Sequence, residues 1–246
     1  SIKNYNKNKM NKCSICNNNL KLIHNKVHSY FINYNSKEAF TIEYCQECKL
    51  FFSLPYIKNE DLIKYYDSSY EAYNTKKSYL GTLQRIKYNS DIKLITKKTK
   101  SSKISLFEIG AGRGEFLFCC KQKGIEVDGC ELSIHGIEYS SFFYEIPLKK
   151  CFAHSISFEK KYNVIVLRHV LEHLNDFYET LKNIYTNGLD DNGILFLKLP
   201  VADSWEAKLF KKYWSGWDVP RHRVHFTKKG IYKLLKDIGY KDIDIK

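Results

Sequence analysis

The sequence lacks the features of a membrane-embedded or exported protein. Its longest apolar runs, such as residues 193–197, are far shorter than the roughly 20 residues that a transmembrane helix needs. No charged segment followed by an apolar one opens the chain, as it would in a secretory leader. We therefore expect a cytoplasmic protein without a membrane span.

Arginine is scarce in a chain that is otherwise strongly basic. Only five of the 40 Lys and Arg residues are Arg, although the formal net charge is +13. Surfaces that read nucleic-acid bases favour Arg, whose planar group bonds in a bidentate way. The lysines here are scattered through a chain rich in Asn, Ile and Tyr, so we expect no nucleic-acid partner.

The length and composition fit a globular protein of one domain with a small addition. The chain has 246 residues, of which 43% are hydrophobic, so a core can form and wholesale disorder is excluded. This length accommodates one α/β domain of about 150 residues and a small satellite module. The sequence does not indicate the oligomeric state.

Two Cys-x-x-Cys pairs mark the N-terminal segment. Cys13 and Cys16 form the first pair and Cys45 and Cys48 the second, with 28 residues between the pairs. Four thiolates at this spacing can surround a structural zinc ion, which a module this small needs for stability. The alternatives are disulfides, which a cytoplasmic enzyme rarely keeps, or free thiols. We expect the other four cysteines to be small buried apolar residues: Cys119, Cys120, Cys130 and Cys151.

Three regions follow from these patterns. Residues 1–55 are expected to form a zinc-ribbon β module, with short strands at residues 30–34 and 40–44. Residues 56–102 are expected to form a helical connector, because apolar residues recur there at a spacing near 3.6 over residues 59–98. The rest, residues 103–246, is expected to be the main domain.

Strands and helices alternate along this main domain. Strands are predicted at residues 104–109, 125–131, 163–167 and 193–199, with one more beginning at residue 242. Helices are predicted at residues 115–123, from residue 133, and at residues 176–185 and 227–238. This order predicts an α/β fold with a doubly wound parallel sheet.

A turn with three glycines follows the first of these strands. Gly110, Gly112 and Gly114 allow a sharp turn and a close approach of the backbone to a ligand. Glu131 ends the next strand, roughly 20 residues on, where a carboxylate can bind ribose hydroxyls. A dinucleotide fingerprint would have a third glycine where this chain has Glu115, so the pattern suits a ligand without phosphate. The alternative is a set of ordinary turn glycines and a surface glutamate.

Residues 106–116 resemble the first motif of class I S-adenosylmethionine (SAM) methyltransferases, E/D-x-G-x-G-x-G. The resemblance implies a Rossmann-like SAM-binding sheet, with Glu108 near the methionine amino group and Glu131 on the ribose. The remaining cofactor contacts that we expect are Gly110, Ala111, Gly112, Gly114, Leu132 and His169.

Three further segments resemble the same family in order and spacing. The family's fourth strand and turn resemble residues 162–174, and its fifth strand resembles residues 190–196. A later D-x-P-R-H stretch of the family resembles residues 217–227. Asn163 stands where the family usually has Asp, which is expected to weaken one supporting hydrogen bond. The family has a seventh strand, and this chain is expected to end at the sixth. We expect the seventh to lie beyond this sequence, the alternative being that a partner replaces it.

The N-terminal segment resembles the leader of many bacterial methyltransferases. Residues 45–53 match its C-x-x-C-g-l-x-f pattern, and Leu62, Tyr65, Tyr66 and Tyr70 match its l-x-x-Y-Y-x-x-x-Y pattern. Such enzymes are often linked to surface polysaccharides, modified sugars or secondary metabolites. The resemblance therefore implies methyl transfer from SAM to a small-molecule acceptor such as a sugar, a nucleotide sugar or a precursor of a surface polysaccharide.

Two other functional readings stay open. One is an RNA or protein methyltransferase in which the zinc ribbon reads the substrate. The other is a non-catalytic SAM-binding or zinc-ribbon scaffold. The scarcity of Arg argues against the first, and the glycine turn followed by Glu131 argues against the second.

Histidines near the predicted strand ends are the candidate bases. An oxygen or nitrogen acceptor must lose a proton, and His is the usual base. We rank His222 first and His169 second, and expect His173 to be structural. Arg221 and Arg223 could bind an acidic acceptor such as a phosphate. For any one of these histidines, the alternative is a structural or surface role.

The acceptor is expected where two loops meet. One loop follows the fourth strand, and the other holds Trp217, Arg221 and His222. The zinc module is expected to cover the opening. Aromatic side chains could supply stacking faces for a sugar, and they are Tyr65, Tyr66, Tyr70, Trp214 and Trp217.

Overall fold

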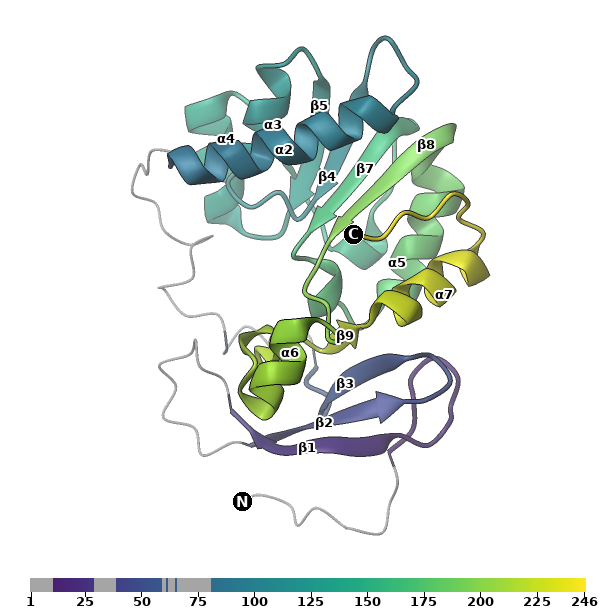
Figure 1. Cartoon of the computed structure of the whole chain (residues 1–246). Coiled ribbons are helices and arrows are strands. Elements are labelled where there is room, and N and C mark those ends of the chain that lie inside the picture. Colours follow the sequence, from purple (N-terminus) through teal and green to yellow (C-terminus); the bar gives the residue numbers. More distant parts are fainter. Residues whose placement is uncertain (1–10, 29–38, 59–60, 62–64, 66–80) are drawn as a thin grey trace. The chain divides into compact units, whose positions relative to one another are not determined.

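The computed structural model describes residues 11–28, 39–58, 61, 65 and 81–246 (Figure 1). The chain divides into two compact units: unit 1 contains residues 1–65 and 200–246, and unit 2 contains residues 66–199. The domain boundaries expected at residues 55 and 102 stay a prediction. The chain passes from unit 1 to unit 2 after residue 65 and returns to unit 1 at residue 200. No helix among the described residues is long and apolar enough to cross a bilayer.

Unit 2 is built on a parallel sheet with the strand order β6-β5-β4-β7-β8. Its strands are β4 (Ser105–Ile109), β5 (Glu126–Glu131), β6 (Lys149–Lys150), β7 (Tyr162–Arg168) and β8 (Leu189–Lys198). Every neighbouring pair runs parallel. The fold class predicted from the alternating pattern is therefore confirmed.

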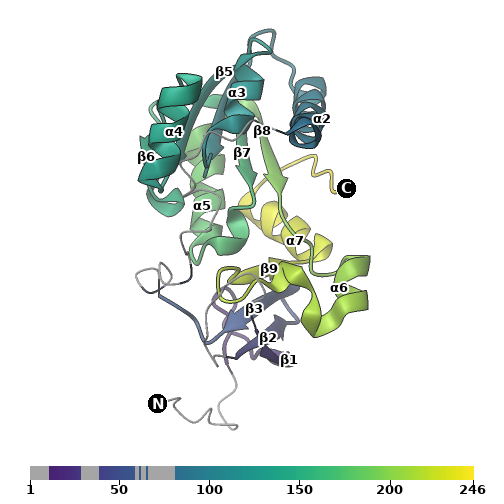
Figure 2. The ribbon, with the colours of Figure 1, turned by 90° about the vertical axis from the view of Figure 1, so that its left-hand side faces the viewer.

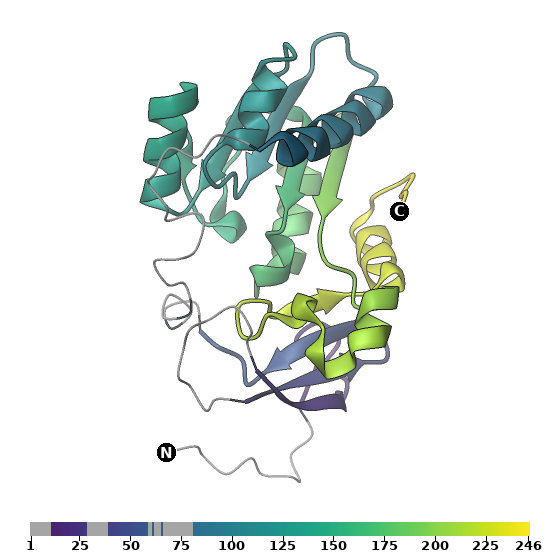
Figure 3. The ribbon, with the colours of Figure 1, turned by 60° about the vertical axis from the view of Figure 1, so that its left-hand side comes forward.

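Helices cover both faces of this sheet, as Figure 2 and Figure 3 show. They are α2 (Thr82–Lys98), α3 (Glu115–Lys121), α4 (Ile134–Tyr144) and α5 (Phe177–Asn183), the last continuing into a π-helical turn at Ile184–Gly188. Successive strand residues point to opposite faces. Leu106 packs into the cluster formed with α2 and α3. The neighbouring Phe107 contacts Phe158 and Tyr162, with ring centroids 5.6 and 5.1 Å apart.

Unit 1 is built on an antiparallel sheet with the strand order β1-β2-β3-β9. Its strands are β1 (Lys21–Val27), β2 (Phe40–Cys45), β3 (Leu50–Leu54) and β9 (Val224–Phe226). The strand predicted at residues 40–44 is present as β2. The strand predicted at residues 30–34, and most of the helical region predicted over residues 59–80, lie outside the described residues.

The C-terminal segment of unit 1 is helical. It contains α6 (Trp205–Phe210), two 3-10 turns at Lys211–Tyr213 and Ser215–Trp217, and α7 (Lys228–Ile238). Thr227 caps α7 as predicted, because its side chain accepts a hydrogen bond from the N–H of Gly230 at 2.9 Å. The strand predicted from residue 242 is absent, since Asp242 has a φ of 50°, which extended backbone does not allow.

Two tryptophans form the centre of the core of unit 1. Trp214 and Trp217 pack edge to face with centroids 5.0 Å apart, and both are buried with Val27, Phe40 and Ile42. They were expected as stacking faces for a sugar. Both rings are buried in the core, where they pack the loop after β8 against the sheet, so they are not available to stack on a sugar.

Candidate functional site

The glycine turn between β4 and α3 has the backbone conformation that only glycine adopts readily. Gly110, Gly112 and Gly114 have φ values of 70°, 57° and 76°. The N–H groups of Gly110 and Ala111 both donate to the carbonyl of Cys130, at 2.9 and 3.0 Å. These bonds fix the turn to the end of β5.

The turn is crowded on one side and open on the other. A Cβ at Gly110 would lie 2.5 Å from Cγ2 of Val170, and a Cβ at Gly114 would overlap Ser140. A Cβ at Gly112 would meet no atom within 4 Å. Gly112 therefore faces space in which a ligand can approach the backbone.

Glu131 lies across the mouth of this turn. Its Oε2 accepts a hydrogen bond from the N–H of Gly112 at 2.8 Å. Its Oε1 accepts from the N–H groups of Leu132 and Ser133, at 2.8 and 2.9 Å. Ser133 is the N-cap of α4, so the carboxylate is held between two loops at the carboxyl ends of β4 and β5. The structure thus brings the predicted residues 110–114, Glu131 and Leu132 together.

Glu108 is buried beneath the turn, with 1% of its surface exposed. Its Oε1 lies 3.1 Å from Nε of Arg168, and its Oε2 accepts no hydrogen bond from the described residues. Burial raises the pKa of Glu108 to about 7, although the charge of Arg168 opposes the shift. One buried carboxylate oxygen is thus left as an acceptor for a polar ligand group.

Arg168 was not singled out in the sequence, yet it organises this side of unit 2. Its guanidinium lies 4.3 Å from the ring centroids of Tyr88 and of Phe116, and Nη1 is 3.8 Å from Asp91. No local sequence pattern predicts this role. The position of Arg168 follows from the parallel pairing of β4 with β7, which places it beside the end of β4.

Glu115, which occupies the place of the third fingerprint glycine, is paired within the protein. Its Oε1 accepts from Nη2 of Arg113 at 2.7 Å, and the hydroxyl of Tyr88 lies 3.4 Å from Oε2. The Arg113 guanidinium in turn lies 4.9 Å from the Tyr139 ring. This acid therefore supports the start of α3 rather than facing a ligand as a free charge.

His169 lies directly after β7, beside the glycine turn. It has a φ of 56°, its N–H donates to the carbonyl of Lys198 at 2.7 Å, and its side chain is exposed. Nδ1 of the ring is 3.5 Å from Oε1 of the buried Glu172. Since Val170 contacts the Gly110 position, the turn that carries His169 borders the predicted cofactor site.

Asn163 keeps its support of the sheet despite replacing the usual Asp. Its Oδ1 accepts from the N–H and the hydroxyl of Ser105, at 2.9 and 3.2 Å. Its Nδ2 donates to Oδ2 of Asp190 at 2.9 Å, which an aspartate could not do. The supporting hydrogen bond is therefore present, and its expected weakening stays a prediction.

His222 belongs to a polar cluster in unit 1. Its Nδ1 lies 2.9 Å from the carbonyl of Gly216, which can only accept, so Nδ1 carries a proton and the lone pair of the neutral ring is on Nε2. Nε2 lies 3.7 Å from Oδ2 of Asp218, whose Oδ1 accepts from Arg221 at 2.9 Å. His222 thus lies beside an acidic residue that also pairs with a cation, and its role as a general base stays a prediction.

The remaining candidate residues lie in buried places or in the other unit. Arg223 is buried, with 5% of its surface exposed, as is the neighbouring His225. His173 lies in the 3-10 turn Leu171–His173 of unit 2. His222 and His169 therefore belong to different units, and the convergence of their loops stays a prediction. Tyr65 is buried, whereas Tyr66 and Tyr70 lie outside the described residues.

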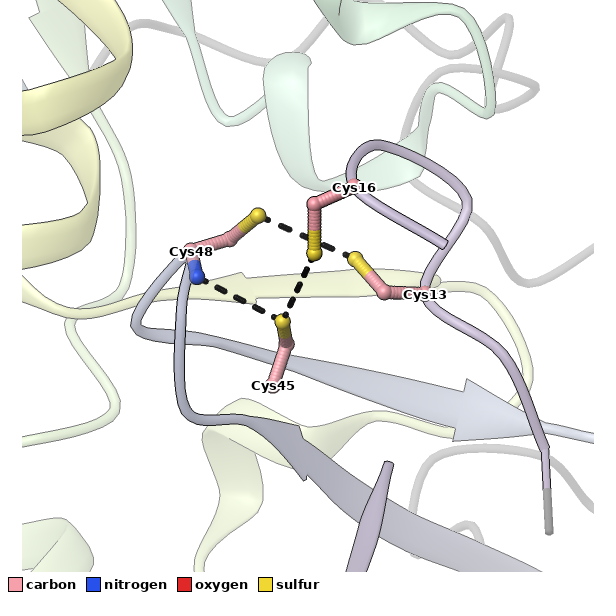
Figure 4. A group of neighbouring side chains, drawn as sticks. All are labelled: Cys13, Cys16, Cys45 and Cys48. Carbon is pink, nitrogen blue, oxygen red and sulfur yellow. Dashed lines mark hydrogen bonds between the residues drawn. The ribbon is translucent and has the colours of Figure 1, made fainter. Parts of the chain in front are cut away.

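The four N-terminal cysteines converge in unit 1 (Figure 4). Their sulfur atoms all lie within 4.8 Å of one another, at 3.8 Å for Cys13 and Cys48 and 3.4 Å for Cys16 and Cys45. A tetrahedral zinc ion with bonds of about 2.3 Å requires sulfurs about 3.8 Å apart. The N–H of Cys48 also donates to the sulfur of Cys45 at 3.4 Å. The donor set and spacing therefore fit zinc, and these sulfurs are too far apart for disulfides.

Comparison with known proteins agrees with this geometry. A family model described as "Methyltransferase domain" matches residues 82–245. A SAM-dependent methyltransferase from Archaeoglobus fulgidus is 20% identical, with a TM-score of 0.53, over 65% of this chain and 71% of that chain. The YcgJ protein from Bacillus subtilis is 17% identical, with a TM-score of 0.53, over 64% and 71%. No curated protein matches the sequence. At these identities, the structural likenesses show the fold.

Proposed function

Since this chain belongs to the methyltransferase domain family and is a class I SAM-dependent methyltransferase, we propose that its acceptor is a small molecule. The acceptor classes that we favour are a sugar, a nucleotide sugar and a precursor of a surface polysaccharide. The leader resemblance over residues 45–70 supports this choice, as does the small, partly buried cluster of Asp218, Arg221 and His222. One cation beside one base suits an acidic small molecule.

The observation that carries the cofactor assignment is the hydrogen bond between Gly112 and Glu131. It places a carboxylate at the open side of a glycine turn, where ribose hydroxyls can replace the N–H of Gly112 as partners of Glu131. The unpartnered oxygen of Glu108 would accept from the amino group of the methionine part. SAM, when bound, supplies the electrophilic methyl group.

His222 is proposed to take the proton of the acceptor. The Gly216 carbonyl fixes the neutral tautomer, so Nε2 is the basic nitrogen, and Asp218 would stabilise the protonated ring. His169, exposed beside the glycine turn, is the second candidate. Arg221 would bind an acidic group of the acceptor while Asp218 holds its guanidinium in place.

Zinc is proposed as a structural ion held by Cys13, Cys16, Cys45 and Cys48. Four cysteine ligands complete a tetrahedral site, so no position is left for a substrate. The ion would hold the turn before β1 and the turn between β2 and β3 together. It is assigned no part in methyl transfer.

The acceptor class can be tested by following a labelled methyl group. The protein is incubated with SAM that carries an isotopic label on its methyl group, with separate pools of nucleotide sugars, RNA and protein. Label in the nucleotide-sugar pool, absent with the Glu131→Ala variant, supports the proposal. Label in RNA or protein alone would replace the small-molecule acceptor by the zinc-ribbon reader hypothesis.

A further inference from the structure

Large apolar side chains are exposed together on α6 and the 3-10 turn that follows it. We name this surface the α6 patch, and its apolar members are Trp205, Leu209, Phe210 and Tyr213. Their exposed fractions are 69%, 62%, 51% and 61%. Four side chains of this size, each more than half exposed within nine residues, offer apolar surface to a partner.

In unit 1, α6 exposes apolar side chains on the side where an ordinary surface helix has polar ones. Ala207 is the buried residue of the helix and packs into the core with Trp214 and Trp217. Residues two before and two after Ala207 lie on the far side of the helix, because each residue turns the helix by about 100°. Trp205 and Leu209 therefore point away from the core, where polar side chains would normally lie.

Positive charge surrounds these apolar groups. The segment 205–213 contains three exposed lysines, Lys208, Lys211 and Lys212, and one acid, Glu206, so its net charge is +2. Nζ of Lys212 lies 4.9 Å from the ring centroid of Tyr213. The ring and the cation thus occupy one surface, and a partner must be apolar and anionic at the same place.

We propose that the α6 patch docks unit 1 on the surface of an anionic lipid bilayer. Trp and Tyr prefer the boundary between head groups and acyl chains, into which Leu209 and Phe210 can insert beside them. Lysines at the rim then lie at the depth of the anionic head groups. A protein partner would require a matching pocket with acidic groups, whereas a bilayer offers both properties together. The proposal goes beyond the methyl transfer and does not depend on the acceptor.

Binding to vesicles tests the proposal with the full chain. The protein is sedimented with vesicles of phosphatidylcholine alone, or of phosphatidylcholine with one quarter phosphatidylglycerol, at low and high salt. We expect binding to the anionic vesicles only, weakened by salt. The double variant Trp205→Ala, Leu209→Ala should lower the partition coefficient at least about tenfold. The variant Lys211→Glu, Lys212→Glu should lower it by a similar factor at low salt.

Matched variants separate the patch from the general positive charge of the chain. Leu83→Ala with Phe142→Ala removes two exposed apolar side chains elsewhere, and Lys97→Glu with Lys98→Glu removes the same charge from α2. Both should bind vesicles as the parent does, and all variants should bind SAM alike. Equal losses in patch and control variants would reduce the effect to net charge and overturn the proposal. Absence of vesicle binding, or a dimer in solution that Trp205→Ala with Leu209→Ala dissociates, would also overturn it.

Discussion

The hydroxyl of Ser53 lies 2.8 Å from Nε2 of His225, a residue 172 positions later in the chain. The same hydroxyl donates to the carbonyl of His222 at 2.9 Å. Because a hydroxyl has only one proton, it must accept from Nε2–H of His225, so this ring nitrogen carries a proton. Strand β3, which follows the second cysteine pair, thus supports both histidines of the D-x-P-R-H stretch.

Acid should destabilise unit 1 through His225. Burial, with the nearby charge of His222, lowers the pKa of His225 well below 6.5. The unfolded state then binds the proton more readily, so stability present above pH 6.5 is lost as the pH falls below it, by up to about 1.4 kcal/mol per pH unit. Urea unfolding at pH 7, 6 and 5 should show this loss, with a smaller slope for His225→Gln. The exposed His154→Gln should keep the parent slope, and equal slopes in all three proteins would contradict the assignment.

Cofactor affinity should depend on Gly112 but not on an equivalent glycine elsewhere. Gly112 and Gly124 both have positive φ, 57° and 76°, and in each case a Cβ would meet no atom within 4 Å. Alanine at either position therefore adds similar backbone strain, about 1 kcal/mol. Titration calorimetry with SAM should show weaker binding by at least about tenfold for Gly112→Ala and Glu131→Ala, because only these alter the site. Binding of NAD without SAM, or equal effects of Gly112→Ala and Gly124→Ala, would refute the site.

One zinc ion per chain should copurify with the protein. Elemental analysis without chelator should find about one equivalent, as four thiolates at tetrahedral spacing require. Cys45→Ser should lose the metal, whereas Cys120→Ser, also buried but in unit 2, should retain it. Metal-free protein with four freely titratable thiols at these positions would exclude the ion.

Turnover should fall when His222 is removed. If its Nε2 takes the acceptor proton, His222→Ala should lower kcat about 10²–10⁴-fold and leave SAM affinity nearly unchanged. His154→Ala serves as the control, since this exposed histidine lies in the 3-10 turn Ala153–Ser155. Unchanged kcat for His222→Ala would leave His169 or positioning alone, and a carbon acceptor with an acidic proton would fit that result.

The parallel sheet of unit 2 could be predicted from the sequence because its signals are local. Strands β4 and β7 are short apolar runs, Ser133 caps α4, and the glycine turn has φ values that other residues avoid, whereas the two lysines of β6 give no strand signal. The predicted Glu131 and residues 110–114 were found together for the same reason. Both follow the ends of adjacent parallel strands, and such ends share one edge of the sheet.

Other features depend on contacts that no local pattern encodes. The pairing of β9 with β3 joins Val224 to Phe52, and three residues are too few for a strand signal. The ion pair of Arg168 with Glu108 depends on register between two strands, and on Tyr88 and Phe116 enclosing the guanidinium. The sequence predicts that a strand begins at Asp242, but the positive φ of this residue is incompatible with extended backbone.

The late arrival of β9 sets the order in which the protein can be assembled during translation. Strand β3 is complete once residue 54 has left the ribosome, but its partner strand begins 170 residues later, at Val224. At about 5–20 residues per second, the open edge of β3 waits on the order of ten seconds or more. During that interval unit 2 can fold as a body inserted between the two halves of unit 1. A crowded polysome therefore exposes unpaired β3 edges on neighbouring nascent chains, for which the β9 strand of another copy is a competing partner.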